Sequence, residues 1–464
     1  MTLNEILKNL FEELDRTHPG GHADVKVLRN PGQLPNFTTT SSGVIRYFTD
    51  TTLKLIQSVA STLLVNDKSR QKAVDESVYR NVVRESVAEV HMLLSADGKV
   101  WSDEIMKEIK AALKDEVAER LNGLTRQFKH YFPVSTSGFG RNAVFDLGPV
   151  SIMSRELWLQ RVDFSPDVKA NYAGVLATNE TWKDEISSAL QSGDPELKLE
   201  GLASSIWPAI NRHGYIISVT IEGKDRVLSR RLAEIVCRTA LDGLSLVFGD
   251  IGFFEHQVLC SESLPPGLVY TMLETNGHLW LPGFYAGRER RDLRDEVLKD
   301  VCTDNANYFA YLGSILDAIV APSSATHPLL SQRWATALNW YAEGARESNS
   351  AIALAKFGSS LDVLASGGKA SGITGMLENL LGCKASSVVV NGEKQRMLSD
   401  LVSEVYDEGR SQILHGNHID QLKSFDESKA YASQLAHLAI MEAAKRLVSF
   451  VGPDQNDKAF RSMQ

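Results

Sequence analysis

The sequence lacks the features that mark membrane, secreted and metal-dependent proteins. Its four cysteines, Cys237, Cys260, Cys302 and Cys383, stand far apart, so the CxxC spacing of a zinc or redox site is missing. There is no HExxH motif and no run near the roughly 20 apolar residues of a membrane span. The N-terminus, MTLNEILKNLFEELDR, alternates apolar and charged residues instead of carrying a signal peptide. We therefore expect a cytoplasmic protein with reduced, buried cysteines, without a membrane segment, metal site or cofactor.

An excess of positive charge is also missing. The chain has 49 Lys and Arg against 58 Asp and Glu, a net charge of −9, which argues against a broad nucleic-acid-coating surface. One basic stretch, GRERRDLR at 287–294, is either a confined phosphate contact or a solvated helix start balanced by its own acids, and the second interpretation is favoured. SGFGRNA at 137–143 has dinucleotide-loop spacing, but a strand-like stretch follows it where a helix is needed.

The chain does contain helical periodicity, in its N-terminal and C-terminal parts. Its length of 464 residues is typical of several domains. Residues 1–130 read as a helical N-terminal module, in which apolar spacing predicts helices at 51–65, 75–94 and 102–124, the last of them opening at Ser102. Residues 131–320 mix short β-branched strands with helices, one of which is predicted at 225–249. The aperiodic stretch 321–328 predicts a domain boundary. Residues 329–452 predict an antiparallel, up-and-down helical bundle, and 453–464 a flexible polar tail. The fold class expected is mainly α with a mixed α/β middle region.

One helix of the predicted bundle, at 394–416, carries a charge in an unusual place. At 100° per residue Arg410 falls between Tyr406 and Leu414, within the arc of apolar side chains. A buried guanidinium cannot lose its charge. Arg410 therefore either pairs with an internal acid such as Asp362, or reaches from the edge of the arc, or faces a groove that receives an anion. His415 follows about 140° further round the helix, which ends at Gly416.

The order of these features resembles the HEPN superfamily of helical ribonuclease and nucleotide-binding domains. Arg410, four intervening residues and His415 match its R-x(4–6)-H motif. The preceding LNWYAEGARE and AIALAKFGSSLDVLAS, followed by VYDEGRSQILHGN, are similar to the Apea-like branch of that superfamily. The resemblance covers roughly residues 330–450.

The resemblance implies a metal-independent endoribonuclease in which the RNA supplies its own 2′-OH as nucleophile. His415 would act as general acid or base, Arg410 would bind the phosphate oxygens, and Asp362 would hold one of them in position. HEPN domains also pair, so a homodimer through the C-terminal domain, with one composite site, is implied.

Two positions depart from the superfamily pattern and leave the function open. Ser411 stands where many active members carry Asn, Asp or His, and Asn417 stands in place of the tyrosine of the toxins that are silenced by nucleotidylation. Two functions are consistent with the sequence. One is an RNA-cleaving effector, as in phage defence or abortive infection, whose residues 1–320 respond to an unknown trigger. The other is a non-catalytic module that binds nucleotide or RNA and acts as a scaffold.

Overall fold

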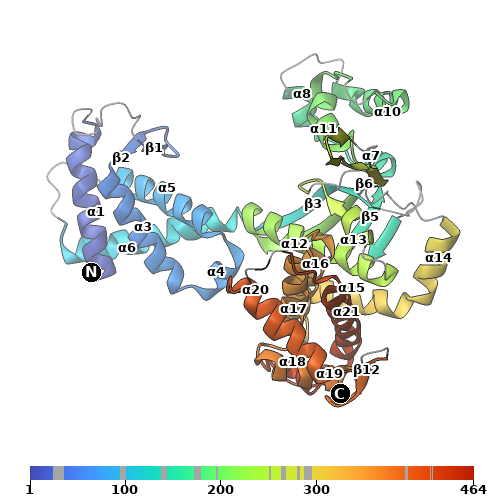
Figure 1. Cartoon of the computed structure of the whole chain (residues 1–464). Coiled ribbons are helices and arrows are strands. Elements are labelled where there is room, and N and C mark those ends of the chain that lie inside the picture. Colours follow the sequence, from blue (N-terminus) through green and yellow to red (C-terminus); the bar gives the residue numbers. More distant parts are fainter. Residues whose placement is uncertain are drawn as a thin grey trace. The chain divides into compact units, whose positions relative to one another are not determined.

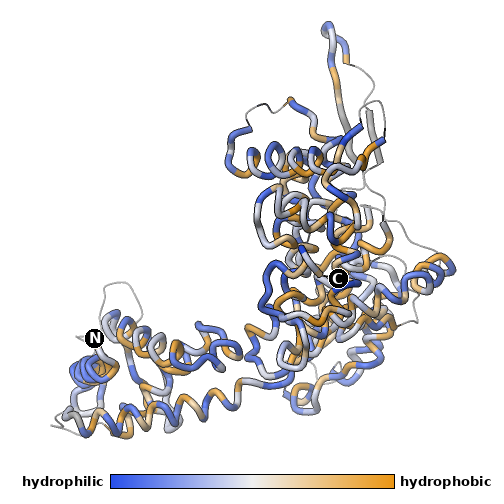
Figure 2. Tube along the Cα trace, turned by 90° about the horizontal axis from the view of Figure 1, so that it is seen from below, coloured by the Kyte–Doolittle hydropathy of each residue, from blue (hydrophilic) through white to orange (hydrophobic). Residues whose placement is uncertain are grey.

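The structure is a computed structural model, and it is mostly helical with a small antiparallel sheet in the middle of the chain (Figure 1). It describes residues 1–24, 36–94, 101–136, 144–171, 179–194, 197–249, 252–262, 268–279, 283–286, 295–391, 395–418, 420 and 422–463. The segments SGFGRNA and GRERRDLR lie outside these residues. Hydrophobic and hydrophilic residues recur along the helices, as amphipathic segments require (Figure 2). None of the described helices has the length and apolar character needed to cross a bilayer.

The chain forms two compact units, and the first comprises residues 1–129 with 220–232. Its elements are α1 (Leu3–Thr17), β1 (Asn36–Thr39), β2 (Ile45–Phe48), α3 (Asp50–Val65), α4 (Lys68–Ala73), α5 (Glu76–Leu94) and α6 (Asp103–Asn122). The apolar stripes of the long helices meet in one core that includes Phe11, Ile56, Val83 and Ile109. The helices expected at 51–65, 75–94 and 102–124 are confirmed, because their periodicity and caps are local signals.

The second unit, residues 130–219 with 233–464, contains most of the sheet. Its strand order is β4–β5–β6–β3–β7. The strands are β3 (Arg126–Ser135), β4 (Val144–Leu147), β5 (Val150–Ser154), β6 (Tyr215–Lys224) and β7 (Val258–Leu259). Among the described helices between β5 and β6, α7 (Arg155–Arg161), α10 (Trp182–Ser192) and α11 (Gly201–Ile210) contribute to a second apolar core, whereas α8 (Pro166–Asn171) has no buried residue. The helix after β6, α12 (Arg226–Phe248), is confirmed where the sequence predicts it.

The cysteines differ from the sequence expectation. None of the four, all of which lie among the described residues, forms a disulfide, but only Cys237 is buried, whereas Cys260 is exposed and Cys302 and Cys383 are partly exposed. Cys237 lies within α12, while Cys260 and Cys383 follow the ends of β7 and of a helix. Burial follows the position in the fold, which an isolated cysteine does not indicate in the sequence.

The C-terminal helices of this unit are α15 (Ala306–Val320), α16 (Pro328–Arg346), α17 (Ser350–Leu364), α18 (Lys369–Leu381) and α21 (Asp426–Ser449). Helix α16 runs antiparallel to α17, since Gly344 lies against Phe357 while the Ser360 hydroxyl donates to the Ala337 carbonyl. It also runs antiparallel to α21, because the Trp334 indole donates to the Ile440 carbonyl and Tyr341 contacts Ser433. The 321–328 loop, predicted as a boundary, joins α15 to α16 inside this unit, where α15 packs on both α16 and α21.

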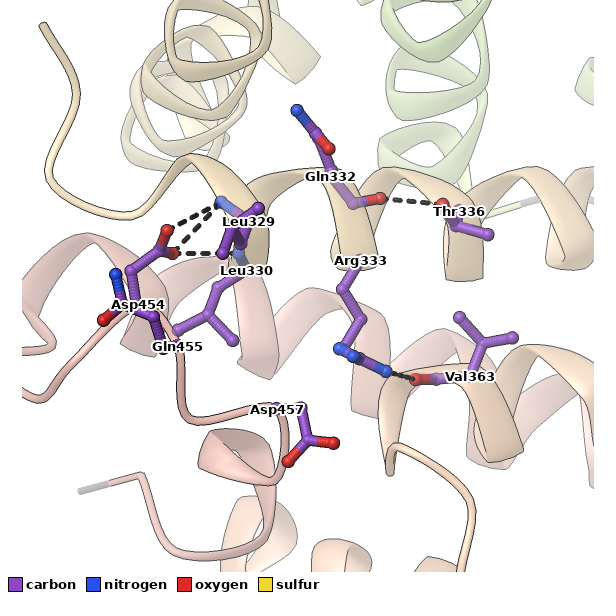
Figure 3. Close-up of a pocket in the computed structure, with 9 residues that line it drawn as sticks. All are labelled: Leu329, Leu330, Gln332, Arg333, Thr336, Val363, Asp454, Gln455 and Asp457. Atoms are coloured by element: carbon purple, nitrogen blue, oxygen red, sulfur yellow. Dashed lines mark hydrogen bonds between the residues drawn. The ribbon is translucent and has the colours of Figure 1, made fainter. Parts of the chain in front are cut away.

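The C-terminal segment from Pro453 is packed, so the expectation of a flexible tail is wrong. Phe460 and Met463 are fully buried. The Asp454 carboxylate accepts hydrogen bonds from the first backbone N–H groups of α16, at Leu329 and Leu330, and so caps that helix (Figure 3). Arg461 donates to the carbonyls that end α17, at 365–367. The polar residues that suggested solvent contact in the sequence bind helix ends.

Candidate functional site

The helix that carries Arg410 is continuous but irregular. It begins as α19 (Leu398–Ser403), widens into a π-helix over Glu404–Ser411, and ends as α20 (Gln412–Leu414). The sequence predicted a start at 394, which is wrong because Arg396 and Met397 form β13 and pair with β12 (Val388–Val390). Residue 394 itself lies outside the described part of the chain. A π-helical turn is rare and is frequent at functional sites.

Two glycines allow this π-helix to lie close to α17. A Cβ on Gly358 of α17 would be 2.9 Å from the Cβ of Arg410 and 3.1 Å from the carbonyl oxygen of Val405. A Cβ on Gly409 would be 2.8 Å from the Leu354 side chain. Gly358 therefore determines how near Arg410 can lie to α17, a role that was not predicted from the sequence. The available signal was a glycine in the middle of a strongly helical stretch, four residues before Asp362.

Arg410 is held by an acid and an aromatic ring. Its Nη2 lies 3.1 Å from Oδ2 of Asp362, and its Nη1 donates to the Tyr406 hydroxyl at 3.3 Å. The guanidinium carbon stands 5.3 Å from the centre of the Tyr406 ring, a cation–π distance. The ion pair with Asp362 is the arrangement that one interpretation of the sequence expected. Tyr406, one helical turn before Arg410, was considered only as an apolar residue.

The pair is enclosed but incompletely satisfied. The Arg410 side chain is 28% exposed and that of Asp362 is 13% exposed. Arg410 Nε and Asp362 Oδ1 are buried and find no hydrogen-bond partner within the residues that the structure describes. Buried polar atoms normally have partners, so this site retains one free donor and one free acceptor. A bound anion or water could contact the exposed part of the guanidinium.

His415 lies at the exposed end of the same helix. Gly416, at φ +70°, adopts the left-handed conformation that ends the helix, as the sequence predicted. The N–H of Gly416 donates to the Ile413 carbonyl and that of Asn417 to the Gln412 carbonyl, which is the hydrogen-bond pattern of a Schellman motif. The His415 side chain is exposed, and no hydrogen bond or ion pair to it occurs among the described residues. An exposed imidazole at a helix end is accessible to a ligand.

The structure thus brings together only part of the predicted site. Arg410 and Asp362 meet, while no hydrogen bond joins either of them to His415 within the described part of one chain. Ser411 accepts the His415 backbone N–H through its carbonyl, and Asn417 contributes its backbone N–H to the helix end. Both supporting residues therefore contribute to the helix end through the main chain.

The surface around the π-helix is acidic, but several of its charges are paired. Glu404 pairs with Arg396 at 2.8 Å and accepts a hydrogen bond from the Ser428 hydroxyl. Glu408 pairs with Lys423 at 3.5 Å. These contacts reduce the repulsion that an approaching phosphate would meet. Among the residues described, no three His, Cys, Asp or Glu side chains gather in a way that could hold a metal ion.

Comparison with known proteins adds no relative. No protein-family model, curated protein or solved structure matches the chain. The resemblance to HEPN domains therefore rests on the motif and on the helix order alone.

Proposed function

We propose that residues 329–452 form a HEPN-like domain that cleaves RNA without a metal ion, through Arg410 and His415. The observation that carries the proposal is an anchored but partly exposed guanidinium, 28% open to solvent, five residues before an exposed histidine at a helix end. Such a pair supplies both a permanent cation and a titratable group on one short surface segment. The proposal covers the activity, the dimer and the RNA substrate.

Arg410 is suited to bind a phosphate. Its guanidinium is always charged, and its planar donors match two nonbridging oxygens. Asp362 and Tyr406 restrict the rotation of the side chain through contacts at 3.1 and 3.3 Å. Less conformational entropy is then lost when the phosphate binds. Asp362 acts as a positioning residue, since it reaches the substrate only through Arg410.

His415 is suited to move the proton. An imidazole has one ring nitrogen that can accept a proton and one that can donate, so it can take the proton of the 2′-OH or give one to the leaving 5′-oxygen. Attack of that hydroxyl on the adjacent phosphate breaks the bond to the 5′-oxygen and leaves a 2′,3′-cyclic phosphate and a 5′-hydroxyl. DNA lacks the 2′-OH and should resist cleavage.

A second copy of the chain would complete the site. Arg410 and His415 are not joined by a hydrogen bond within one chain, and the exposed Leu414 beside them, at 55% exposure, offers apolar surface for a partner. A twofold axis along this helix would place two motifs face to face. It would also double the local positive charge, which the acidic chain otherwise lacks. In this proposal residues 1–320 sense the trigger or restrain the nuclease.

The test combines activity, products and assembly. Purified protein is incubated with a labelled RNA and a DNA of the same sequence, with and without EDTA, and the product ends are probed by kinase labelling and ligation. We expect chelator-resistant cleavage of RNA only, lost in His415→Ala and Arg410→Ala but retained in His278→Ala, a control at another exposed histidine. Sedimentation velocity should show a dimer at micromolar concentration.

Three results would contradict the proposal. Cleavage of DNA or dependence on a divalent metal would exclude the mechanism that uses the 2′-OH and the histidine. Full activity of folded His415→Ala protein would remove that residue from the mechanism. RNA binding that requires Arg410, without any cleavage, would favour the non-catalytic scaffold.

A further inference from the structure

A cleft of about 730 Å³ lies in the second unit, apart from the Arg410 site. It is bordered by the start of α15, the end of α18 and the last turns of α21. Its volume falls within the range of small-molecule sites in proteins. Tyr308, Tyr311, Leu438 and Met441 supply aromatic and apolar surface, and the exposed carboxamide of Asn307 stands among the lining residues.

Tyr308, one of the residues that line this cleft, has a buried hydroxyl without a hydrogen-bond partner among the described residues. The residue as a whole is 6% exposed. Burial raises the pKa of Tyr308, so the hydroxyl keeps its proton at neutral pH. A buried hydroxyl that forms no hydrogen bond lowers stability, and a ligand acceptor would remove that penalty.

The rim of the cleft carries one available cation. Arg446 is engaged by Glu442 at 2.9 Å and by the carbonyls of Met463 and Leu380 at 2.8 and 2.9 Å. Lys445 shares the same carboxylate at 3.2 Å, but its side chain is 60% exposed. An ammonium group has three donors, so Lys445 retains donors for an anion in the cleft.

We propose that this cleft binds a small molecule that consists of a planar ring with a hydrogen-bond acceptor and an attached anionic group. The ring would lie against the two tyrosines and Met441, because flat apolar walls favour planar ligands. The acceptor would meet the Tyr308 hydroxyl, and the anion would meet Lys445. A nucleotide and an aromatic carboxylic acid share this chemistry. The site lies beyond the proposed ribonuclease function and does not depend on it.

Calorimetric titration of the full chain tests the proposal. Adenosine 5′-monophosphate is the probe for a nucleotide, and indole-3-acetate is the probe for an aromatic carboxylic acid. Adenosine and inorganic phosphate, the neutral and the anionic part of the nucleotide, are titrated separately for comparison. We expect one of the two anionic probes to bind saturably and more tightly than either part. Tyr308→Phe should weaken that binding roughly five- to tenfold, the effect of one lost hydrogen bond. Lys445→Gln should bring the affinity for the anionic probe close to that for a neutral one, whereas Lys458→Gln, outside the cleft, should change nothing.

Thermal unfolding without ligand separates binding from a structural role. Tyr308→Phe removes only the unpartnered hydroxyl, so the midpoint should stay unchanged or rise, while the rise on adding the probe should shrink. Absence of binding by both anionic probes would overturn the proposal. It would also be overturned if both variants bound like the Lys458→Gln control, or if Tyr308→Phe unfolded at a lower temperature than the wild type.

Discussion

Acid should destabilise the first unit through two buried histidines whose hydrogen bonds require them to be neutral. The Nε2 of His18 accepts the Tyr47 backbone N–H at 3.0 Å. The Nδ1 of His91 accepts from Arg46 Nε at 3.1 Å, while its Nε2 lies 3.0 Å from the Asp15 carboxylate. A ring nitrogen that accepts a hydrogen bond cannot carry a proton. Protonation of either ring would therefore place its new N–H against the donor that it now accepts from, the Tyr47 backbone N–H for His18 or Arg46 Nε for His91.

The size of the effect follows from the His18 pKa. Burial lowers this pKa from its ordinary 6.5 to about 4, and it lowers the pKa of His91 as well. Between these values the unfolded chain binds a proton on His18 that the folded chain does not, so stability falls as the pH falls through this window. At about 1.4 kcal/mol per pH unit, His18 alone accounts for a loss of about 3 kcal/mol. Such a loss is a large part of the stability of a small domain.

Hydrogen exchange of the full chain can measure this loss in the first unit alone. Protein equilibrated in urea at several pH values, from about 7 down to about 4.5, receives a short labelling pulse at one fixed pH. The mass of peptides from α1 and α5 then reports unfolding. We expect His18→Gln to be less stable at neutral pH and to show a smaller loss on acidification. His278→Gln, at an exposed position, should retain the wild-type dependence. Equal pH dependence in wild type and His18→Gln would refute the reasoning.

Four substitutions test the packing of the second unit, each by urea unfolding with hydrogen exchange of its C-terminal helices as the measurement. Gly358→Ala should lower the free energy of unfolding by about 1–3 kcal/mol, because the added Cβ would meet the π-helix. Gly375→Ala is the control: nothing lies within 4 Å of its added atom, so it should be neutral or stabilise by about 0.5–1 kcal/mol. Equal effects of the two substitutions would contradict the close approach of α17 and the π-helix. Asp362→Asn should lower the free energy of unfolding by about 1–3 kcal/mol, since it leaves the Arg410 charge half-buried and without its acidic partner. An unchanged unfolding midpoint would show that solvent alone solvates that charge. Phe460→Ala should lower the free energy of unfolding by about 3–5 kcal/mol, because Phe460 is fully buried. A change close to zero would support the flexible tail that the sequence predicted.

Helices could be predicted from the sequence where their signals are local. The apolar spacing of 51–65 and the Ser102 cap both lie within one segment, and α3 and α6 form there. Gly416 ends its helix in the left-handed conformation for the same reason. The π-helix was not predicted, and the close approach to α17 that Gly358 and Gly409 allow is a contact between elements far apart in the sequence. The packed C-terminal segment was missed because its partners lie about 90 to 125 residues earlier in the chain.

For the candidate site, the sequence by itself determined which chemical groups are present and how far apart they stand along one helix: a permanent cation at 410, a titratable ring at 415 and a stop at 416. The sequence offered Asp362 as one possible partner of that cation, and only the tertiary structure decided among the alternatives, since Asp362 comes from another helix and reaches Arg410 at 3.1 Å. It also decided that Tyr406 faces the guanidinium and that Tyr308, which lines a cleft, keeps a buried hydroxyl without a partner among the described residues. The physical reason is that periodicity and capping act over a few residues, whereas burial and ion pairing depend on elements far apart in the chain.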